Sequence, residues 1–358
     1  MIASAQDIPH MTGLRAVAAS MVLLLHFDEI HGNVLARYFA PVTQGYLGVD
    51  IFFVLSGYIL SHVYSEMFAK LSVRNYGLFL WRRLARIYPV HVVVLAALIV
   101  MVAARGLLNT NFWLLSEIPR HLALMQAWTD SLTWNVPAWS ISAEWAAYGL
   151  FPLFAIIFLG RAPIWPGLAL VVGLLTVFQL TYLRAGGLAS AFMGWPALLR
   201  VMCEFAIGVL GYRLSRSLLP SWKYDVACAL SFTVMLVVPF ALVQIIAIGI
   251  FVPAVAASRS LVRQVLASKA AVALGVVSYS VYMVHFPVLK LVQNFNYRFG
   301  LEKTSDLVAP GLTVFWAVMV VVLAAMTYRA IEKPARDWCR RSEQYFFARQ
   351  LRGADPLT

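Results

Sequence analysis

The sequence predicts an all-α, polytopic transmembrane helix bundle, and composition, segment length and charge placement each point to it. Hydrophobic residues make up 61% of the 358-residue chain and charged residues only 12%, whereas soluble domains carry about 25% charged residues. The mean hydropathy is +0.78. Apolar segments of about 20 residues, the length that crosses a bilayer as a helix, recur along the chain. The core of such a protein is the interior of its helix bundle.

We predict about ten membrane spans in one continuous domain. They lie at residues 12–27, 46–63, 85–104, 140–159, 165–183, 193–212, 225–240, 242–257, 271–289 and 310–329. The break at Val238-Pro239 separates the seventh and eighth spans, and one long helix kinked by Pro239 is the alternative there. We assign residues 1–340 to the transmembrane domain and residues 341–358 to a short cytoplasmic tail.

The distribution of positive charge predicts the orientation. The formal net charge is +12, and cytoplasmic loops of membrane proteins carry an excess of Lys and Arg. With the N-terminus inside, most of the 28 Lys and Arg residues fall on the inner side. We therefore predict that both termini are cytoplasmic. Because the orientation accounts for the positive charge, we do not expect the protein to bind nucleic acid. The three cysteines match no zinc-site spacing, so no bound metal is expected.

The first span carries two ionisable groups, Arg15 and His26, inside the apolar segment "GLRAVAASMVLLLHFDEIHG". They are eleven residues apart, only ~20° from whole helical turns, so both project from one face, roughly 16 Å apart along the axis. Groups this costly in lipid face the bundle interior or mark a functional path. A snorkelling arginine and a histidine bonded to a nearby carbonyl are the structural alternative.

Other spans carry ionisable groups at the same predicted depth as His26. Glu144, in "WSISAEW", and His285, in "SYSVYMVHFP", both fall in the outer half of their spans. Asp50, in the first turn of the second span, is interpreted as a helix cap. Arg200 and Glu204 are one helical turn apart, and we expect them to satisfy each other.

The opposite, inner side carries the cluster "RRLAR", with Arg82, Arg83 and Arg86 where the third span begins. Such a cluster anchors topology in many membrane proteins, but guanidinium groups also bind phosphate bidentately. A neutral histidine is a good general base near neutral pH, and a carboxylate can orient it. A long donor molecule with phosphates at one end and a reactive group at the other would fit this arrangement, and a coenzyme A thioester has that form. Its phosphates would bind the arginines, and its acyl group would lie near His26.

Six motifs in order give the chain a resemblance to the membrane acyltransferase 3 family. Arg15 and His26 match its Arg-X10-His signature, and "RRLAR" matches its Arg-Arg-X-X-Arg motif. The segments "FFVLSGYIL", "WSISAEW", "SYSVYMVHFP" and "IEKPAR" match further blocks, so that the resemblance spans about residues 8–338. It implies a multi-pass acyltransferase of the bacterial inner (cytoplasmic) membrane, with acyl-CoA, expected to be acetyl-CoA, as donor and no tightly bound cofactor.

The resemblance implies a role for each candidate residue. His26 would act as the general base or form a transient acyl-imidazole, with Glu144 orienting it and Ser140 donating to the developing oxyanion. Donor phosphates would be held by Arg82, Arg83 and Arg86. Arg15 would contact the donor pyrophosphate or gate the tunnel. The acceptor pocket would be lined by Trp139, Tyr279, Tyr282 and His285. Glu332 and Arg336 are expected to form a structural pair.

The acceptor stays open at this level: a polysaccharide, a lipid-linked oligosaccharide or a hydroxylated small molecule. The outer loop at residues 106–139, with Trp113, Trp128 and Trp134, is its expected platform. A transporter or flippase of lipid-linked sugar, with His26 and Glu144 as a proton relay, is the alternative function. The matching interrupted helices that mark many transporters are not found in the two halves of this chain. The oligomeric state is not predicted.

Overall fold

The computed structural model describes residues 8–70, 72–110, 112–129, 133–160, 163–184, 194–299 and 306–352, with side chains in the last helix described as far as Glu343. Arg161 and Lys303, which entered the charge distribution, and residues 353–358 of the predicted tail lie outside this part. The described chain is helical, with one isolated bridge between Ser221 and Ser258 and no strand. The predicted all-α polytopic bundle is confirmed.

The helices overlap the ten predicted spans, but the helix of the third span begins twelve residues earlier and that of the ninth span ends ten residues later. In chain order they are α1 (Pro9–Glu29), α2 (Val34–Tyr38), η2 (Ala40–Gln44), α3 (Leu47–Tyr64), α4 (Val73–Ala103), η3 (Leu115–Glu117), α5 (Ile118–Leu122), α6 (Ala138–Phe154), η4 (Ala155–Leu159), α7 (Trp165–Arg184), α8 (Gly194–Ser215), α9 (Lys223–Val237), α10 (Ala241–Ala257), α11 (Leu261–Leu266), α12 (Lys269–Phe299), α13 (Ala309–Thr327), η7 (Tyr328–Glu332) and α14 (Lys333–Arg352).

Each of the ten predicted spans corresponds to one helix. Seven segments are long and apolar enough to cross a membrane: α1, α3, α4, α6 with η4, α7, α12, and α13 with the beginning of α14. Helix α10 is apolar but shorter, and α8 and α9 fall outside the seven. The count of ten spans therefore stays a prediction. At Val238-Pro239 the chain does break, and α9 and α10 pack against each other as separate helices.

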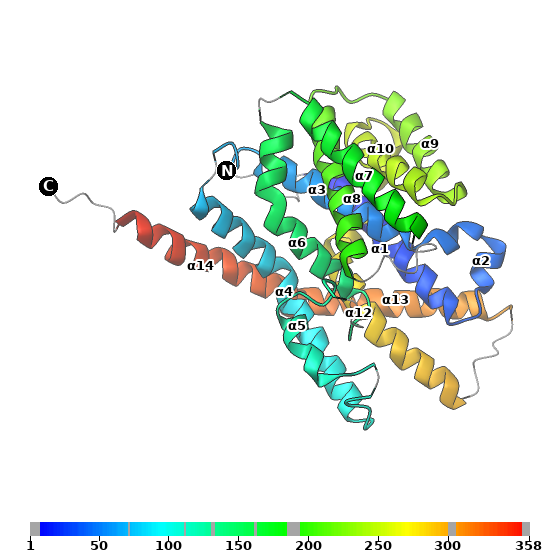
Figure 1. The fold of residues 1–358 in the computed structure, drawn as a ribbon. Coiled ribbons are helices and arrows are strands. Elements are labelled where there is room, and N and C mark those ends of the chain that lie inside the picture. The colour runs from blue at the N-terminus through cyan, green and yellow to red at the C-terminus, as the bar shows by residue number, and fades with distance from the viewer. Residues whose placement is uncertain are drawn as a thin grey trace.

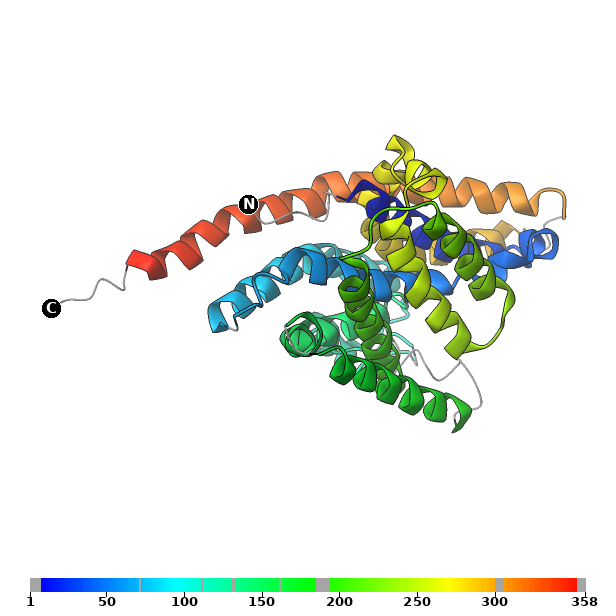
Figure 2. The ribbon, with the colours of Figure 1, turned by 90° about the horizontal axis from the view of Figure 1, so that it is seen from above.

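The bundle has two ends, which we name by what they carry. At the tail end, α14 and the first half of α4 project from the bundle on the same side and pack against each other (Figures 1 and 2). At the opposite, histidine end, α1 finishes at Glu29, α4 at Ala103 and α12 at Phe299. Helix α1 packs against α3, α12 and α13.

Glycines allow the closest helix contacts of the bundle. A Cβ at Gly208 of α8 would lie 2.0 Å from the carbonyl oxygen of Val54 in α3, and one at Gly57 of α3 would lie 2.2 Å from that of Phe205 in α8. Gly275 of α12 approaches the Thr12 carbonyl of α1 equally closely, at 1.9 Å. Small residues at such crossings let backbones touch, which is how helices associate in lipid.

We expect Gly208→Ala to lower the thermal unfolding temperature of the protein in detergent. The added methyl group would push α3 and α8 apart, and overpacking of this kind costs about 1–3 kcal/mol of unfolding free energy. Gly77→Ala in α4 is the matched control, since nothing lies within 4 Å of a Cβ there. Equal unfolding temperatures for the two variants would contradict the close contact.

Helix α14 crosses the predicted boundary between the transmembrane domain and the tail. The predicted boundary at residue 340 falls inside α14, which runs to Arg352. Beyond this boundary, both carboxylate oxygens of Glu343 accept hydrogen bonds from Arg82 of α4, at 2.9 and 2.8 Å. The tail end is thus built jointly by α4 and α14.

Candidate active site

Two adjoining cavities run from the tail end into the bundle. The chamber at the tail end has a volume of about 490 Å³, and the mid-bundle cavity has about 110 Å³. The two share six lining residues: Thr12, Arg15, Ile59, Leu60, Arg83 and Arg86. A wide compartment therefore narrows into a smaller one at a ring that contains three guanidinium groups.

The tail-end chamber is strongly cationic. Arg82, Arg83 and Arg86 of α4 line it together with Arg15 of α1, as predicted, and α14 adds Arg336 and Arg340. Glu343 is the one carboxylate in its lining, and it is already paired with Arg82. Arginines gathered without matching carboxylates favour an anionic ligand with several oxygens, such as a pyrophosphate.

Two arginines of the ring, Arg83 and Arg15, bond to uncharged partners. Arg83 donates to the Tyr64 hydroxyl at 3.1 Å, and its guanidinium lies over the Tyr64 ring. Arg15 donates from Nε to Ser278 Oγ at 3.3 Å. Within the described residues, neither Arg15 nor Arg86 forms an ion pair. Their charges are therefore available to a ligand.

The mid-bundle cavity brings together the predicted polar residues of α6 and α12. Ser140 and Tyr282 share a hydrogen bond of 2.9 Å between their hydroxyl oxygens. The Tyr279 hydroxyl donates to the carbonyl of Ile87. Glu144 accepts a hydrogen bond from Ser56 of α3 and lines the same cavity. Five hydroxyl groups and one carboxylate thus line the space beyond the arginine ring, from Ser56, Ser140, Tyr148, Tyr279, Tyr282 and Glu144.

The two predicted histidines meet at the histidine end. The rings of His26 and His285 stack with centroids 5.5 Å apart and an interplanar angle of 11°. His285 is buried and donates from Nδ1 to the carbonyl of Tyr282 at 2.6 Å. His26 is partly exposed, and its Nδ1 lies 3.0 Å from Oε2 of Glu29. Tyr282 lines the mid-bundle cavity and packs against His285, and neither histidine lines that cavity.

Two of the predicted roles are not matched by contacts. The carboxylate that contacts His26 is Glu29, one turn away on α1, whereas Glu144 bonds to Ser56. Trp139 and His285 were both expected to line the acceptor pocket, but both are buried and neither lines a described cavity. Trp139 packs edge-on against Phe53. Of the three loop tryptophans, Trp113 lines a cavity, while Trp134 is fully buried and supports it.

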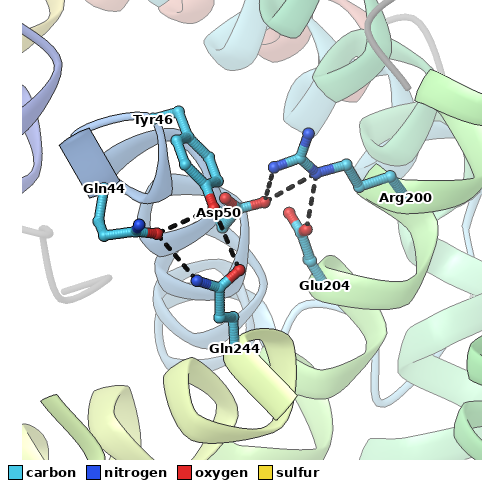
Figure 3. Close-up of polar contacts among 6 residues, drawn as sticks. All are labelled: Gln44, Tyr46, Asp50, Arg200, Glu204 and Gln244. Carbon is cyan, nitrogen blue, oxygen red and sulfur yellow. Dashed lines mark hydrogen bonds and ion pairs between the residues drawn. The ribbon is translucent and has the colours of Figure 1, made fainter. Parts of the chain in front are cut away.

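The interpretation of Asp50 as a helix cap is wrong. Asp50 is buried at 1% exposure and accepts a hydrogen bond from Arg200 of α8 at 2.8 Å (Figure 3). The same guanidinium donates to Glu204 at 3.2 Å, so the predicted Arg200–Glu204 pair is present with a third member. A buried guanidinium draws in a carboxylate from a neighbouring helix because its charge is costly in an apolar environment.

We expect Arg200→Leu to destabilise the bundle strongly. It would leave two buried carboxylates without their shared counter-charge, and breaking a buried ion pair costs about 3–5 kcal/mol. The measurement is thermal unfolding in detergent. The variant Asp50→Asn/Arg200→Leu/Glu204→Gln, which removes all three charges, should recover most of the loss. An Arg200→Leu variant as stable as the wild type would contradict the buried ion pairs of Arg200.

The sequence is similar to that of known acyltransferases. The pattern of the acyltransferase domain matches residues 8–329. The chain belongs to the acyltransferase 3 family. It is 26% identical to acyltransferase MdmB of Streptomyces mycarofaciens over 366 aligned residues, and this alignment covers 91% of each chain. It is 22% identical over 370 residues to the peptidoglycan O-acetyltransferase OatA of Listeria monocytogenes serovar 1/2a, covering 93% of this chain and 56% of OatA. No solved structure matches significantly.

For this member of the acyltransferase 3 family, the structure adds site residues that the sequence analysis missed or assigned only to structure. Arg336 lies in the chamber wall, 3.5 Å from the buried Glu332, whose other oxygen accepts from Ser280 at 2.8 Å. Glu332 ends the π-helical segment η7, a distortion often found at functional sites. The signal for Glu29 was its i, i+3 spacing from His26. Arg340 carried no signal beyond its positive charge.

Proposed function

We propose that the protein is a membrane O-acyltransferase that takes an acyl group, expected to be acetyl, from acyl-CoA and passes it to a hydroxyl of a saccharide or similar acceptor. The observation that carries the proposal is the cationic chamber that narrows into a polar cavity. Coenzyme A has the same form, because its phosphates form a bulky anionic end and its pantetheine arm is thin.

The proposal assigns the donor to the tail end. Arg15, Arg83 and Arg86 bind donor phosphates, with Arg82 held in place by Glu343. The arm passes the ring and brings the thioester beside Ser140, Tyr279 and Tyr282. A hydroxyl of Ser140 or Tyr282 then donates to the carbonyl oxygen as negative charge develops on it. The donor is a co-substrate and needs no tightly bound cofactor.

His26 acts as the base in this proposal. It removes the proton from the acceptor hydroxyl, the oxygen attacks the thioester carbonyl, the carbon–sulfur bond breaks, and the proton ends on the thiol of coenzyme A. Glu29 stabilises the imidazolium that forms. Attack by His26 itself, through an acyl-imidazole, gives the same products. In either route the reacting groups must meet past Tyr282, which lines the mid-bundle cavity and packs against His285.

The orientation follows from the donor. Acyl-CoA is cytoplasmic, so we place the tail end in the cytoplasm and the histidine end on the outer face of a bacterial inner membrane. The relatives support the acceptor class, since OatA is named as a peptidoglycan O-acetyltransferase. A transporter that uses His26 and Glu144 as a proton relay is less favoured, because Glu144 bonds to Ser56 and His26 to Glu29.

The test is turnover of acetyl-CoA by the purified protein in lipid nanodiscs, with a mixture of cell-wall oligosaccharides as acceptor. We expect release of coenzyme A thiol and an equal amount of base-labile O-acetyl ester. A transporter would leave the thioester intact, and this result would reject the proposal.

A further inference from the structure

An open groove at the histidine end is built differently from the cavities described above. Its volume is about 470 Å³, and it lies between the end of α4, the segment that follows it, and the last turns of α12. A second groove of about 410 Å³ adjoins it, since Gln293 lines both. Glu29, the partner of His26, lines the second groove. A path therefore leads from the first groove to the proposed base.

The first groove offers aromatic faces beside amide groups. Trp113 and Tyr297 line it together with Gln293 and Asn294. Sugar rings stack on aromatic side chains through their apolar faces, while amides bond to their hydroxyls, and specific pockets combine a few polar groups with apolar walls. The groove is therefore suited to a saccharide.

The surrounding chain holds Trp113 in position. Its ring packs edge-on against the buried Trp134, with centroids 5.2 Å apart. The Trp113 carbonyl accepts from the backbone N–H of Asn109 at 2.9 Å, and Asn109 adopts a left-handed conformation that closes this turn. A rigid aromatic face costs less conformational entropy on binding than a mobile one.

The groove also carries positive charge without a carboxylate in its lining. Arg105 and Lys290 line it, and neither forms an ion pair within the described residues. Lys290 donates to Gln293 at 3.2 Å and lies over the Phe286 ring. By contrast, Arg37 and Arg120 at the same end are paired with Asp306 and Glu117. Two available cations in a saccharide-binding groove indicate an anionic ligand.

We propose that this groove binds the acceptor, and that the acceptor is a saccharide bearing a carboxylate or phosphate, which Arg105 and Lys290 recognise while Trp113 stacks on a sugar ring. The proposal rests on the proposed function and adds the substrate class. The anionic residue occupies the first groove, and the neighbouring sugar extends along Gln293 toward Glu29 and His26.

The experiment separates binding from turnover. Isothermal titration of the protein in phosphatidylcholine nanodiscs would use a hexuronate tetrasaccharide, its carboxyl-reduced form, and a tetrasaccharide 1-phosphate. We expect at least one acidic probe to bind about tenfold more tightly than the reduced form, and Arg105→Gln or Lys290→Gln to remove that difference. Arg298→Gln, which changes an exposed arginine of the same helix end, is the control and should bind like the wild type. Equal binding of acidic and neutral probes would overturn the proposal.

Turnover then distinguishes this proposal from the proposed function. With the preferred acidic acceptor, Arg105→Gln should raise the acceptor KM about tenfold and leave kcat unchanged. Acidic-probe binding without any acetyl transfer would reject the proposed function but keep the groove. If acetyl transfer is unchanged in both Arg105→Gln and Lys290→Gln, the groove is not the acceptor site, but the proposed function stands. If these substitutions instead release phosphatidylglycerol from mixed-lipid nanodiscs and leave saccharide binding unchanged, the site binds lipid headgroups and the proposal fails.

Discussion

His26→Ala is expected to lower kcat for acyl transfer by about 10²–10⁴-fold, the range that general-base catalysis contributes. The side chain lies at the histidine end, against His285 and Glu29. Its removal leaves the arginine chamber unchanged, so the KM for acetyl-CoA should change little. Initial rates at saturating donor and acceptor measure this effect directly.

Two companion variants make the result specific. His62→Ala, which changes a half-buried histidine outside the described cavities, is the control and should keep wild-type rates. Glu29→Gln keeps the shape of the partner but removes its charge, so kcat should fall by less than in His26→Ala. Turnover of His26→Ala at the wild-type rate would exclude the proposed base.

Arg86→Leu is expected to raise the KM for acetyl-CoA by about 10–100-fold, since a hydrogen bond to a charged group contributes about 1.5–3 kcal/mol. Arg86 lines both cavities and has no ion-pair partner among the described residues, so its charge is available to the donor phosphates. Arg82→Leu should have a smaller effect, because Glu343 already neutralises that guanidinium. Steady-state rates against acetyl-CoA concentration give both values.

The control for this series is Lys223→Gln, which changes an exposed cation at the beginning of α9. Dephospho-coenzyme A thioesters, which lack one phosphate, add a second comparison. Substituting the arginine that binds this phosphate should change the KM for the dephospho donor much less than the KM for acetyl-CoA. An unchanged KM in Arg83→Leu and Arg86→Leu alike would exclude the chamber as the donor site.

Local sequence patterns predicted much of this arrangement. The helices follow the predicted spans because apolar length is encoded within each segment. Arg82, Arg83 and Arg86 lie within five consecutive residues of α4, so their grouping follows from helical spacing alone. The meeting of His26 with His285 followed from depth, since both were expected in the outer halves of their spans.

The features that were missed depend on contacts between distant segments. Asp50 and Arg200 are 150 positions apart, and the sequence carries no sign that α3 and α8 cross at glycines. Glu343 lies beyond the expected domain boundary, and its approach to Arg82 depends on α14 continuing past residue 340. Glu144 was expected at the same depth as His26, but depth does not tell which neighbouring helix a side chain faces.

Tyr282 and His285 have a consequence for the cell as a whole. A membrane enzyme that draws one substrate from each face risks becoming a leak for ions. Under the proposed function, the two approaches end at a buried tyrosine and a buried imidazole that pack against each other. This packing would then preserve the electrochemical gradient at rest and would keep outside water from hydrolysing a waiting thioester.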